Sequence, residues 1–343
     1  MKRQNPIVRW ISISIILQVA ILSYINFIYL PNRGKVSVSA FNFSDEKVGD
    51  KTVKLPNGAE NIEISYNGLY AAYKLDNRIE VYDVKAGKVV KKLDAKSGKV
   101  SCFRWLLDRD ILIYSVKEPD GKAGQVQLLT YDLGAGAERN YPKLTGLTDG
   151  SEVIDIEVSA LTNVVYFKVK TSETRVKIYK YNIMDRLKFV MNAKVETVIK
   201  ETAYEDNLVY SDTKDDIYVV KGSNSSKDKF YFNESLVLLE IDSEDNIYAG
   251  VLNDSGKVVA IKAGKTDTPE KEWKTVELKN AAAAEDIFIP DGGGIYVADR
   301  ENKTITDVQS GSSYAYKGEL LDVLDDYKVT VEGNKLHLSA VAK

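Results

Sequence analysis

Short runs of alternating apolar and polar residues fill most of the chain, and turn-forming residues separate them. Residues 61–65, 69–75, 78–84 and 89–93 form the clearest set and predict four successive β-strands. Seven times a turn leads into an apolar strand with a tyrosine near its start. From the first of these turns to the last there are 258 residues in six intervals, a mean of 43. This period is typical of β-propeller blades, each built from four antiparallel strands.

The repeat predicts an all-β protein, a seven-bladed β-propeller over residues 36–343. The individual spacings range from 32 to 53 residues, so six or eight blades also fit. The last repeat, Leu320–Ala342, supplies only about three strands. We therefore expect a segment near the N-terminus, either Val36–Phe41 or Thr52–Leu55, to complete that blade. Closure of this kind removes the exposed strand edges of an open array.

An uncharged run of 21 residues, Trp10–Leu30, precedes the repeats. An α-helix of that length spans the hydrocarbon core of a bilayer. We expect residues 1–9 to form a cytoplasmic tail, 10–30 a transmembrane signal anchor and 31–35 a linker. Three basic residues before the run against two after it favour an N-terminus inside the cell. A signal peptide cleaved after Ala40 is the alternative.

Four residues of this run have specific expected roles in the membrane. The rings of Trp10 and Tyr29 lie at its two ends, where amphipathic aromatic side chains favour the interface. Gln18 and Asn26 lie within it and offer hydrogen bonds to a partner helix. A simple anchor that tolerates single polar side chains explains them equally well.

Composition indicates an exported bacterial domain. The lone cysteine, Cys102, excludes an intramolecular disulfide, whereas an exported eukaryotic domain of this size is expected to contain several. The first 35 residues hold five basic and no acidic side chains, so residues 36–343 carry all 50 acidic residues against 42 basic ones. This acidic balance argues against binding to nucleic acid. The predicted location is the bacterial cytoplasmic membrane, crossed once, with the propeller outside.

The strand and turn motifs resemble a known repeat. Residues 64–73, followed by Ile79–Val84 and Ala86-Gly87-Lys88, are similar to the WD40-like propeller repeat of TolB-type proteins. The propeller part of dipeptidyl-peptidase-like proteins carries a similar repeat, but no hydrolase domain follows here. The resemblance covers residues 36–343 and implies a propeller used for interaction or scaffolding.

Most catalytic and metal-dependent schemes lack the residues they need. His337 is the only histidine, so neither a zinc site nor a histidine-based triad is available. The run Asp242–Asn246 resembles a calcium loop in its first five positions, but Ile247 and Asn253 replace the glycine and glutamate that the loop requires. We therefore expect no metal and no cofactor.

One set of charged residues emerges when the blades are aligned on their turns. Arg104, Glu157, Glu201 and Glu240 each lie six residues before the anchoring turn residue. Inner strands line the central channel of a propeller, so these four side chains are predicted to converge at its rim. Such a site suits a cation, a sugar or a basic peptide.

The sequence therefore predicts a non-enzymatic, membrane-tethered module that binds a protein partner or an envelope glycan. The loops 117–121, 222–226 and 264–272 are the expected contact regions. An accessory subunit of an envelope-polysaccharide or secretion machine is one alternative. A glycan hydrolase or lyase that uses the channel carboxylates is another, because paired carboxylates perform acid–base chemistry on glycosidic bonds.

Overall fold

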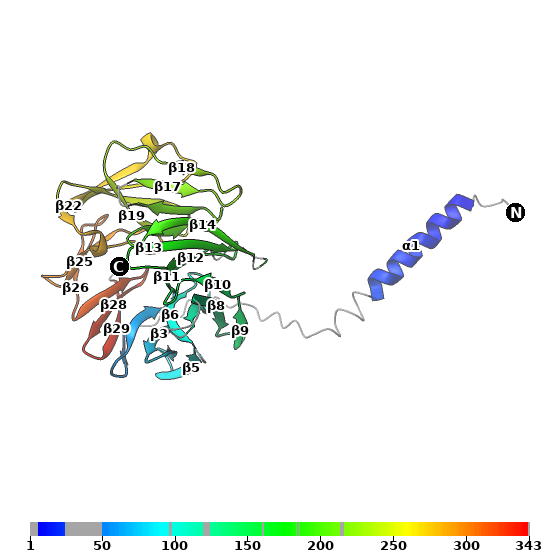
Figure 1. The fold of residues 1–343 in the computed structure, drawn as a ribbon, viewed down its shortest axis with the longest axis horizontal. Helices are drawn as coiled ribbons and strands as arrows, with labels where there is room; N and C mark the ends of the chain where they lie inside the picture. The colour runs from blue at the N-terminus through cyan, green and yellow to red at the C-terminus, as the bar shows by residue number, and fades with distance from the viewer. Residues whose placement is uncertain are drawn as a thin grey trace. The chain divides into compact units, whose positions relative to one another are not determined.

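The computed structural model describes residues 6–24, 50–95, 98–118, 124–159, 161–182, 184, 186–212 and 216–341. The chain divides into two units, residues 1–46 and 47–343. The second unit contains seven antiparallel sheets. Figure 1 shows these sheets around a centre near which β6, β11 and β19 lie, with β5, β9, β18 and β22 towards the rim. The prediction of a seven-bladed all-β propeller is confirmed.

The first three blades follow one another along the chain, each numbered here from its inner to its outer strand. Blade one consists of β2 (Glu60–Ile64), β3 (Tyr70–Leu75), β4 (Arg78–Asp83) and β5 (Lys88–Asp94). Blade two consists of β6 (Lys99–Trp105), β7 (Ile111–Lys117) and β8 (Gly124–Asp132), with β9 (Ala137–Asn140) and β10 (Leu144–Leu147) both paired to β8. Blade three consists of β11 (Glu152–Ser159), β12 (Val164–Lys170), β13 (Arg175–Tyr181) and β14 (Leu187–Lys194).

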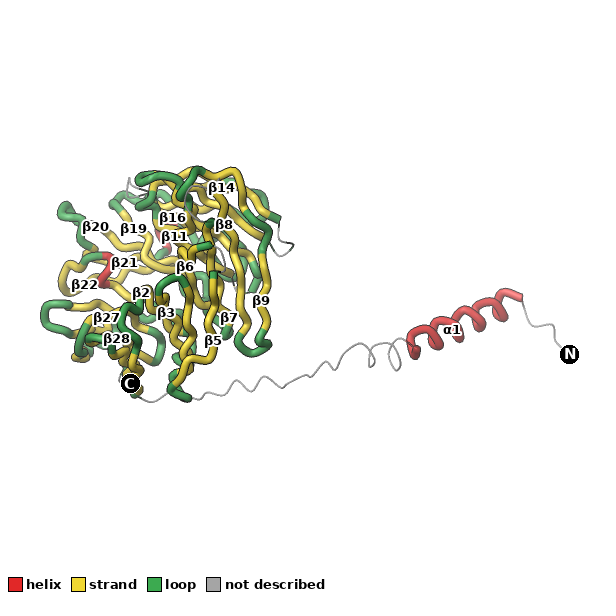
Figure 2. The backbone as a smooth tube through the Cα atoms, turned by 60° about the horizontal axis from the view of Figure 1, so that its bottom comes forward, coloured by secondary structure: helices red, strands yellow, loops and turns green. Residues whose placement is uncertain are grey.

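The remaining blades repeat this order. Blade four consists of β15 (Val198–Glu201), β16 (Leu208–Ser211), β17 (Ile217–Val220) and β18 (Lys227–Lys229). Blade five consists of β19 (Leu236–Ile241), β20 (Ile247–Leu252), β21 (Val258–Gly264) and β22 (Lys274–Ala282), with a 3-10 turn at Glu270–Glu272. Blade six follows a second 3-10 turn, Ala284–Asp286, and consists of β23 (Ile287–Phe288), β24 (Tyr296–Asp299), β25 (Thr304–Asp307) and β26 (Ser313–Ala315). Figure 2 shows the strands in yellow and the loops that join them in green.

Blade seven is built from both ends of the propeller unit. Its strands β27 (Glu319–Val323), β28 (Tyr327–Glu332) and β29 (Lys335–Ala340) come from the C-terminus. Its outer strand is β1 (Lys51–Lys54), which pairs antiparallel with β29 in the register Val53↔Leu336. Of the two segments expected to complete this blade, Thr52–Leu55 is therefore the correct one. Val36–Phe41 lies outside the described residues.

The hydrophobic core lies between the blades. Seven clusters of buried apolar side chains each join one blade to the next, and the cluster of Val53, Tyr73 and Val329 joins blade seven to blade one. Because each blade buries one face against each neighbour, its strands are apolar on both faces at the middle of the sheet. The ring is therefore held together by packing of successive blades, and β1 closes the last gap.

The repeated turn residues have a backbone reason. Gly68, Asn163, Asp206, Asp245 and Gly293 occupy equivalent turns and have φ values between 53° and 79°. Glycine adopts this left-handed conformation without strain, and asparagine and aspartate tolerate it better than other residues do. The turn signal that revealed the repeat in the sequence is therefore a requirement of the turn geometry.

The N-terminal unit contains one described element, helix α1 (Pro6–Tyr24). It covers part of the predicted anchor, and Trp10 is exposed on it. Gln18 donates a hydrogen bond from Nε2 to Ser14 Oγ at 3.3 Å, so it is satisfied within its own helix. Asn26 and Tyr29 lie outside the described residues.

The described part of the chain contains no helix long and apolar enough to cross a membrane. The helix begins at Pro6 and ends at Tyr24, whereas the predicted span covered residues 10–30. The transmembrane helix is therefore not supported by the described residues.

Candidate functional site

Three of the four predicted channel residues lie in one network of ion pairs. Arg104, Glu157 and Glu240 belong to the inner strands β6, β11 and β19. Contacts run from β6 to β11, then to β15 and β19, so these strands are successive neighbours around the channel. The structure therefore brings these three predicted side chains together, whatever the channel binds.

The network links four blades through two cationic side chains. Arg104 Nη1 lies 2.5 Å from Glu157 Oε1, and its Nη2 lies 3.6 Å from Asp155 Oδ1. Lys200 Nζ lies 2.6 Å from Glu240 Oε2 and 3.6 Å from Glu157 Oε1. The carboxylates beside Lys200 outweigh the effect of its burial and raise the pKa of the ammonium group. Both cations therefore stay charged, and each holds two carboxylates in place.

Glu201 does not belong to this network, and its place in the predicted set is taken by Lys200. In the ladder of β15 and β16, Lys200 pairs with Val209 and Glu201 pairs with Leu208. Successive residues of a strand point to opposite faces of the sheet, so a shift of one residue moves the side chain away from the channel. Glu201 instead accepts a hydrogen bond from the backbone N–H of Ser159.

The alignment also missed Glu63 on β2 and Asp322 on β27. Burial raises the pKa of Glu63 to about 7, although Arg104 and a hydrogen bond from the backbone N–H of Trp105 lower it in part. Asp322 is exposed on its strand, and its Oδ1 accepts a hydrogen bond from the backbone N–H of its neighbour Val323. The alternation Ile62-Glu63-Ile64 was the available signal, because it places one charge between two apolar residues of an inner strand.

The paired arrangement limits what the channel does chemically. Glu157 and Glu240 are each bound to a cation at hydrogen-bond distance. Each ion pair occupies a carboxylate oxygen that acid–base chemistry would need free to face a substrate. The network therefore connects the blades electrostatically, and this geometry favours a structural role over acid–base chemistry.

A different surface presents side chains outward. We define the turn face as the described residues of the seven segments between the first and second strands of each blade, which surround one mouth of the channel: 65–69, 106–110, 161–163, 202–207, 242–246, 289–295 and 324–326. In blades one to four, one large apolar side chain of each turn is exposed: Tyr66 (38%), Leu107 (53%), Leu161 (56%) and Tyr204 (62%). In blades five to seven the apolar residues of these turns are buried or half-buried, and the exposed residues are Ser243, Glu244, Gly292 and Asp325.

Hydrogen bonds between neighbouring blades fix the turns of this face. Asp245 of blade five accepts bonds from the backbone N–H groups of Ala203 and Tyr204 of blade four, at 2.5 and 3.1 Å. Similar bonds join Asn67 to Asp110, Ser159 to Ala203, Ser243 to Asp291 and Gly292 to Asp325. Because bonds of this kind join five of the seven neighbouring pairs of blades, the exposed side chains are presented on a preorganised surface.

A cleft of about 430 Å³ opens on the turn face between blades four and five. Tyr204 and Glu205 line one side, and Lys265, Thr266 and Asp267 line the other. The latter three belong to the loop 264–272, one of the expected contact regions.

The strand order shows on which side of the propeller each expected contact loop lies. In an antiparallel blade, the loop between the third and fourth strands lies on the same side as the turn between the first and second strands. The loops 264–272 and 222–226 are of this kind and therefore lie on the turn-face side. The loop 117–121 joins the second and third strands and belongs to the opposite side, and its residues 119–121 lie outside the described residues.

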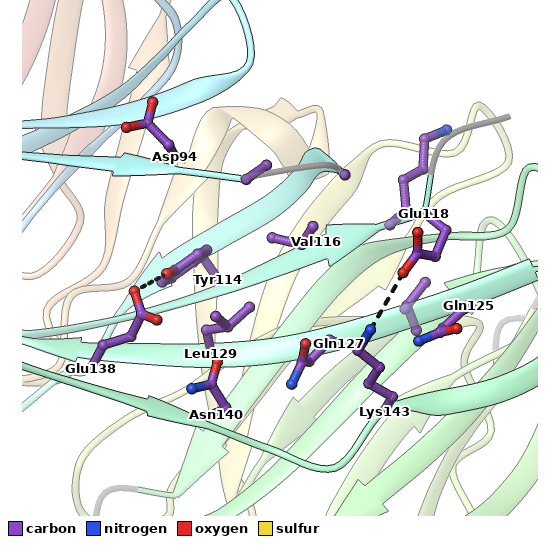
Figure 3. Close-up of a pocket in the computed structure, with 14 residues that line it drawn as sticks. Asp94, Tyr114, Val116, Glu118, Gln125, Gln127, Leu129, Glu138, Asn140 and Lys143 are labelled. Carbon is purple, nitrogen blue, oxygen red and sulfur yellow. Dashed lines mark hydrogen bonds and ion pairs between the residues drawn. The ribbon is translucent and has the colours of Figure 1, made fainter.

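A smaller pocket of about 140 Å³ lies beside blades one and two, away from the turn face. Figure 3 shows two pairs among its polar side chains: Tyr114 donates to Glu138 at 2.9 Å, and Lys143 bonds to Glu118 at 3.4 Å. Burial and Glu138 raise the pKa of Tyr114, so its hydroxyl stays protonated. These two pairs occupy four of the polar side chains that line the pocket.

No family model matches this chain, and no curated protein matches it. Solved structures share its fold. The β-propeller domain of Cps50 (Swd1) from Myceliophteria thermophila aligns with a TM-score of 0.53 and 13% identity, covering 85% of this chain and 98% of that one. A prolyl endopeptidase aligns with a TM-score of 0.51 and 12% identity, covering 78% of this chain and 42% of that one. At these identities the likeness shows the fold alone, a seven-bladed propeller resembling those of WD40 and prolyl endopeptidase proteins.

Proposed function

We propose that this protein is a binding module that holds a protein partner against its turn face. The observation that carries the proposal is the row of four exposed apolar side chains on neighbouring blades, Tyr66, Leu107, Leu161 and Tyr204. Single exposed apolar residues are ordinary on protein surfaces, but a group at equivalent positions on one face is typical of an interface. The propeller fold itself typically serves as a binding or scaffold module.

Site-specific photocrosslinking in the source cells tests this proposal. A photoreactive residue replaces Leu107 or Leu161 in the full-length chain, and the control replaces Val90, which is 42% exposed on the outer strand β5. We expect a discrete protein adduct from the two turn positions and none from Val90. Adducts from Val90 with none from either turn would refute the proposal.

A second experiment measures how much the apolar side chains contribute. With the photoreactive residue at Tyr204, we expect the double change Leu107→Ser and Leu161→Ser to reduce the adduct at least about tenfold, because two apolar anchors that contribute about 1 kcal/mol each exceed the roughly 1.4 kcal/mol that corresponds to a factor of ten. Val90→Ser is the matched control and should leave the yield unchanged. Digestion of the adduct with protease or with glycosidase distinguishes a protein partner from an envelope glycan.

Two alternatives have separate tests. An accessory subunit that docks through residues 10–30 should lose its partners when this segment is replaced by polyleucine. A glycan hydrolase or lyase should lose turnover with Glu157→Gln or Glu240→Gln while the fold is retained. The pairing of both carboxylates with cations disfavours the second alternative.

Location in the bacterial cytoplasmic membrane, with the propeller outside, is part of the proposal. It rests on the uncharged run Trp10–Leu30 of the sequence. Alkaline extraction of membranes should leave the chain in the pellet, and protease added to intact spheroplasts should degrade the propeller. Release into the alkaline supernatant would contradict the membrane location.

A further inference from the structure

The chemistry of the partner follows from the charges of the turn face. We infer that the turn face binds a basic polypeptide segment, whose apolar side chains pack on Leu107, Leu161 and Tyr204 and whose lysine or arginine side chains lie over the turns of blades five to seven. This inference rests on the proposed function and adds the class of partner to it.

Acidic side chains dominate the seven turns. The only basic residue among them is Arg109, and Asp108 binds its guanidinium at 2.8 and 2.5 Å. The turns contain ten carboxylates: Asp108, Asp110, Glu205, Asp206, Asp242, Glu244, Asp245, Asp291, Asp325 and Asp326. Six of them lie in blades five to seven, where Asp242 is buried, the other five lie at or near the surface, and the exposed apolar side chains are absent. The face therefore has an apolar part and a strongly acidic part.

The least compensated of these carboxylates lies in blade six. The backbone carbonyl of Asp291 accepts hydrogen bonds from Ser243, but its carboxylate has no partner among the described residues. Burial, together with the nearby carboxylates of Asp325 and Glu240, raises the pKa of Asp291 to about 7. A cationic side chain placed here would relieve this repulsion, which makes the position complementary to lysine or arginine.

Other classes of ligand use only part of this surface. Phosphates of nucleic acids and anionic lipid headgroups would be repelled by the carboxylates. A neutral glycan would leave the acidic part unmatched, and a small cation would leave the apolar part unused. A basic polypeptide with interspersed apolar residues matches both parts, as interfaces with charge complementarity around apolar anchors do.

Fluorescence anisotropy with short labelled peptides and the purified full-length chain tests the inference. The first probe combines arginine, tyrosine and glycine, the second replaces arginine with glutamate, and the third replaces tyrosine with serine. We expect the first probe to bind best and the glutamate probe not to bind. Raising the salt concentration from about 50 to about 300 mM should weaken binding of the arginine probe about tenfold, because screening reduces the attraction between exposed charges.

Two matched pairs of substitutions localise the effect. Asp291→Asn with Asp325→Asn removes two charges from the turn face, and the amide oxygen introduced by Asp325→Asn can still accept the hydrogen bond from the N–H of Gly292. Asp254→Asn with Glu332→Gln removes two charges from exposed turns on the opposite side of the propeller. We expect about tenfold weaker binding from the first pair and no change from the second.

The outcomes separate the inference from the proposed function. Equal binding of the arginine and glutamate probes, or equal effects of the two pairs, would overturn the inference of a basic partner. The proposed function would still stand if turn-face crosslinking persisted in the Asp291→Asn and Asp325→Asn variant. Loss of crosslinking only at Leu107→Ser and Leu161→Ser would then indicate a partner recognised by its apolar side chains alone.

Discussion

Replacing Glu63 with glutamine should stabilise the protein at alkaline pH and have little effect at acid pH. Burial raises the pKa of this carboxyl from 4.5 to about 7 in the folded protein. In the unfolded chain the carboxyl ionises near its ordinary pKa of 4.5. Between pH 4.5 and about pH 7 the folded state therefore binds the proton more tightly than the unfolded state does. The contribution of Glu63 to stability is therefore lost as pH rises from about 4.5 to about 7. The shift corresponds to about 3 kcal/mol, at about 1.4 kcal/mol for each tenfold change in proton affinity.

The glutamine variant does not titrate, and its amide oxygen still accepts the hydrogen bond from the backbone N–H of Trp105. Denaturant unfolding of both proteins at several pH values measures the difference in unfolding free energy. This difference should increase by about 3 kcal/mol in favour of the variant between about pH 4 and pH 8. Glu60→Gln, an exposed position on the same strand, serves as the control. A difference that is the same at every pH would refute the reasoning.

Two further substitutions test the network and the closure of the ring. Lys200→Met leaves Glu157 and Glu240 without their shared cation and should cost about 3 kcal/mol of unfolding free energy, whereas Lys74→Met, at an exposed ion pair, should cost less than about 1 kcal/mol. Equal shifts of the two denaturation midpoints would contradict this role of Lys200. Val53→Asp places a charge on a side chain that is 2% exposed in the closing strand, and it should cost more than about 3 kcal/mol and increase cleavage by protease. Unchanged protease resistance would show that β1 is dispensable for closure.

The architecture was predictable from the sequence because its signals are local. Turns with a positive φ favour residues such as Asn163 and Gly293, so the turns can be recognised from residue type. The strands between the turns show their apolar pattern directly. The closing strand was predictable for a topological reason, because the last repeat lacked a strand and a ring leaves no edge unpaired. The seven blades and their closure therefore follow from short-range patterns and one counting argument.

The channel site was predictable only in part, because side-chain direction depends on register. The alignment anchored blade four on Asn207, but Asp206 has the positive φ that Asn163 has in blade three. Six residues before Asp206 lies Lys200, whereas in blade five the positive φ is at Asp245 and Glu240 lies only five residues before it. The count from turn to channel therefore differs between blades, and a fixed count of six from Asn207 selected Glu201 instead of Lys200. The sequence Asp206-Asn207 offers two residues that both tolerate the left-handed conformation, so nothing local distinguishes them. The slip also replaced a cation with a third carboxylate and made the predicted site more acidic than the observed network.

The division of the turn face into an apolar and an acidic part depends on chain order as well as on local residues. An apolar side chain inside a polar turn, such as Leu107 or Leu161, does not fit the strand pattern and was visible in the sequence. A propeller places its blades around the axis in the order in which they occur along the chain, so a difference between the N-terminal and C-terminal repeats becomes a difference between two sides of one face. The apolar residues of the first four turns therefore meet on one side, and the carboxylates of the last three turns gather on the other. The proposed basic polypeptide, spanning the channel mouth, would contact both parts, and the order of the repeats would then determine which polypeptide fits.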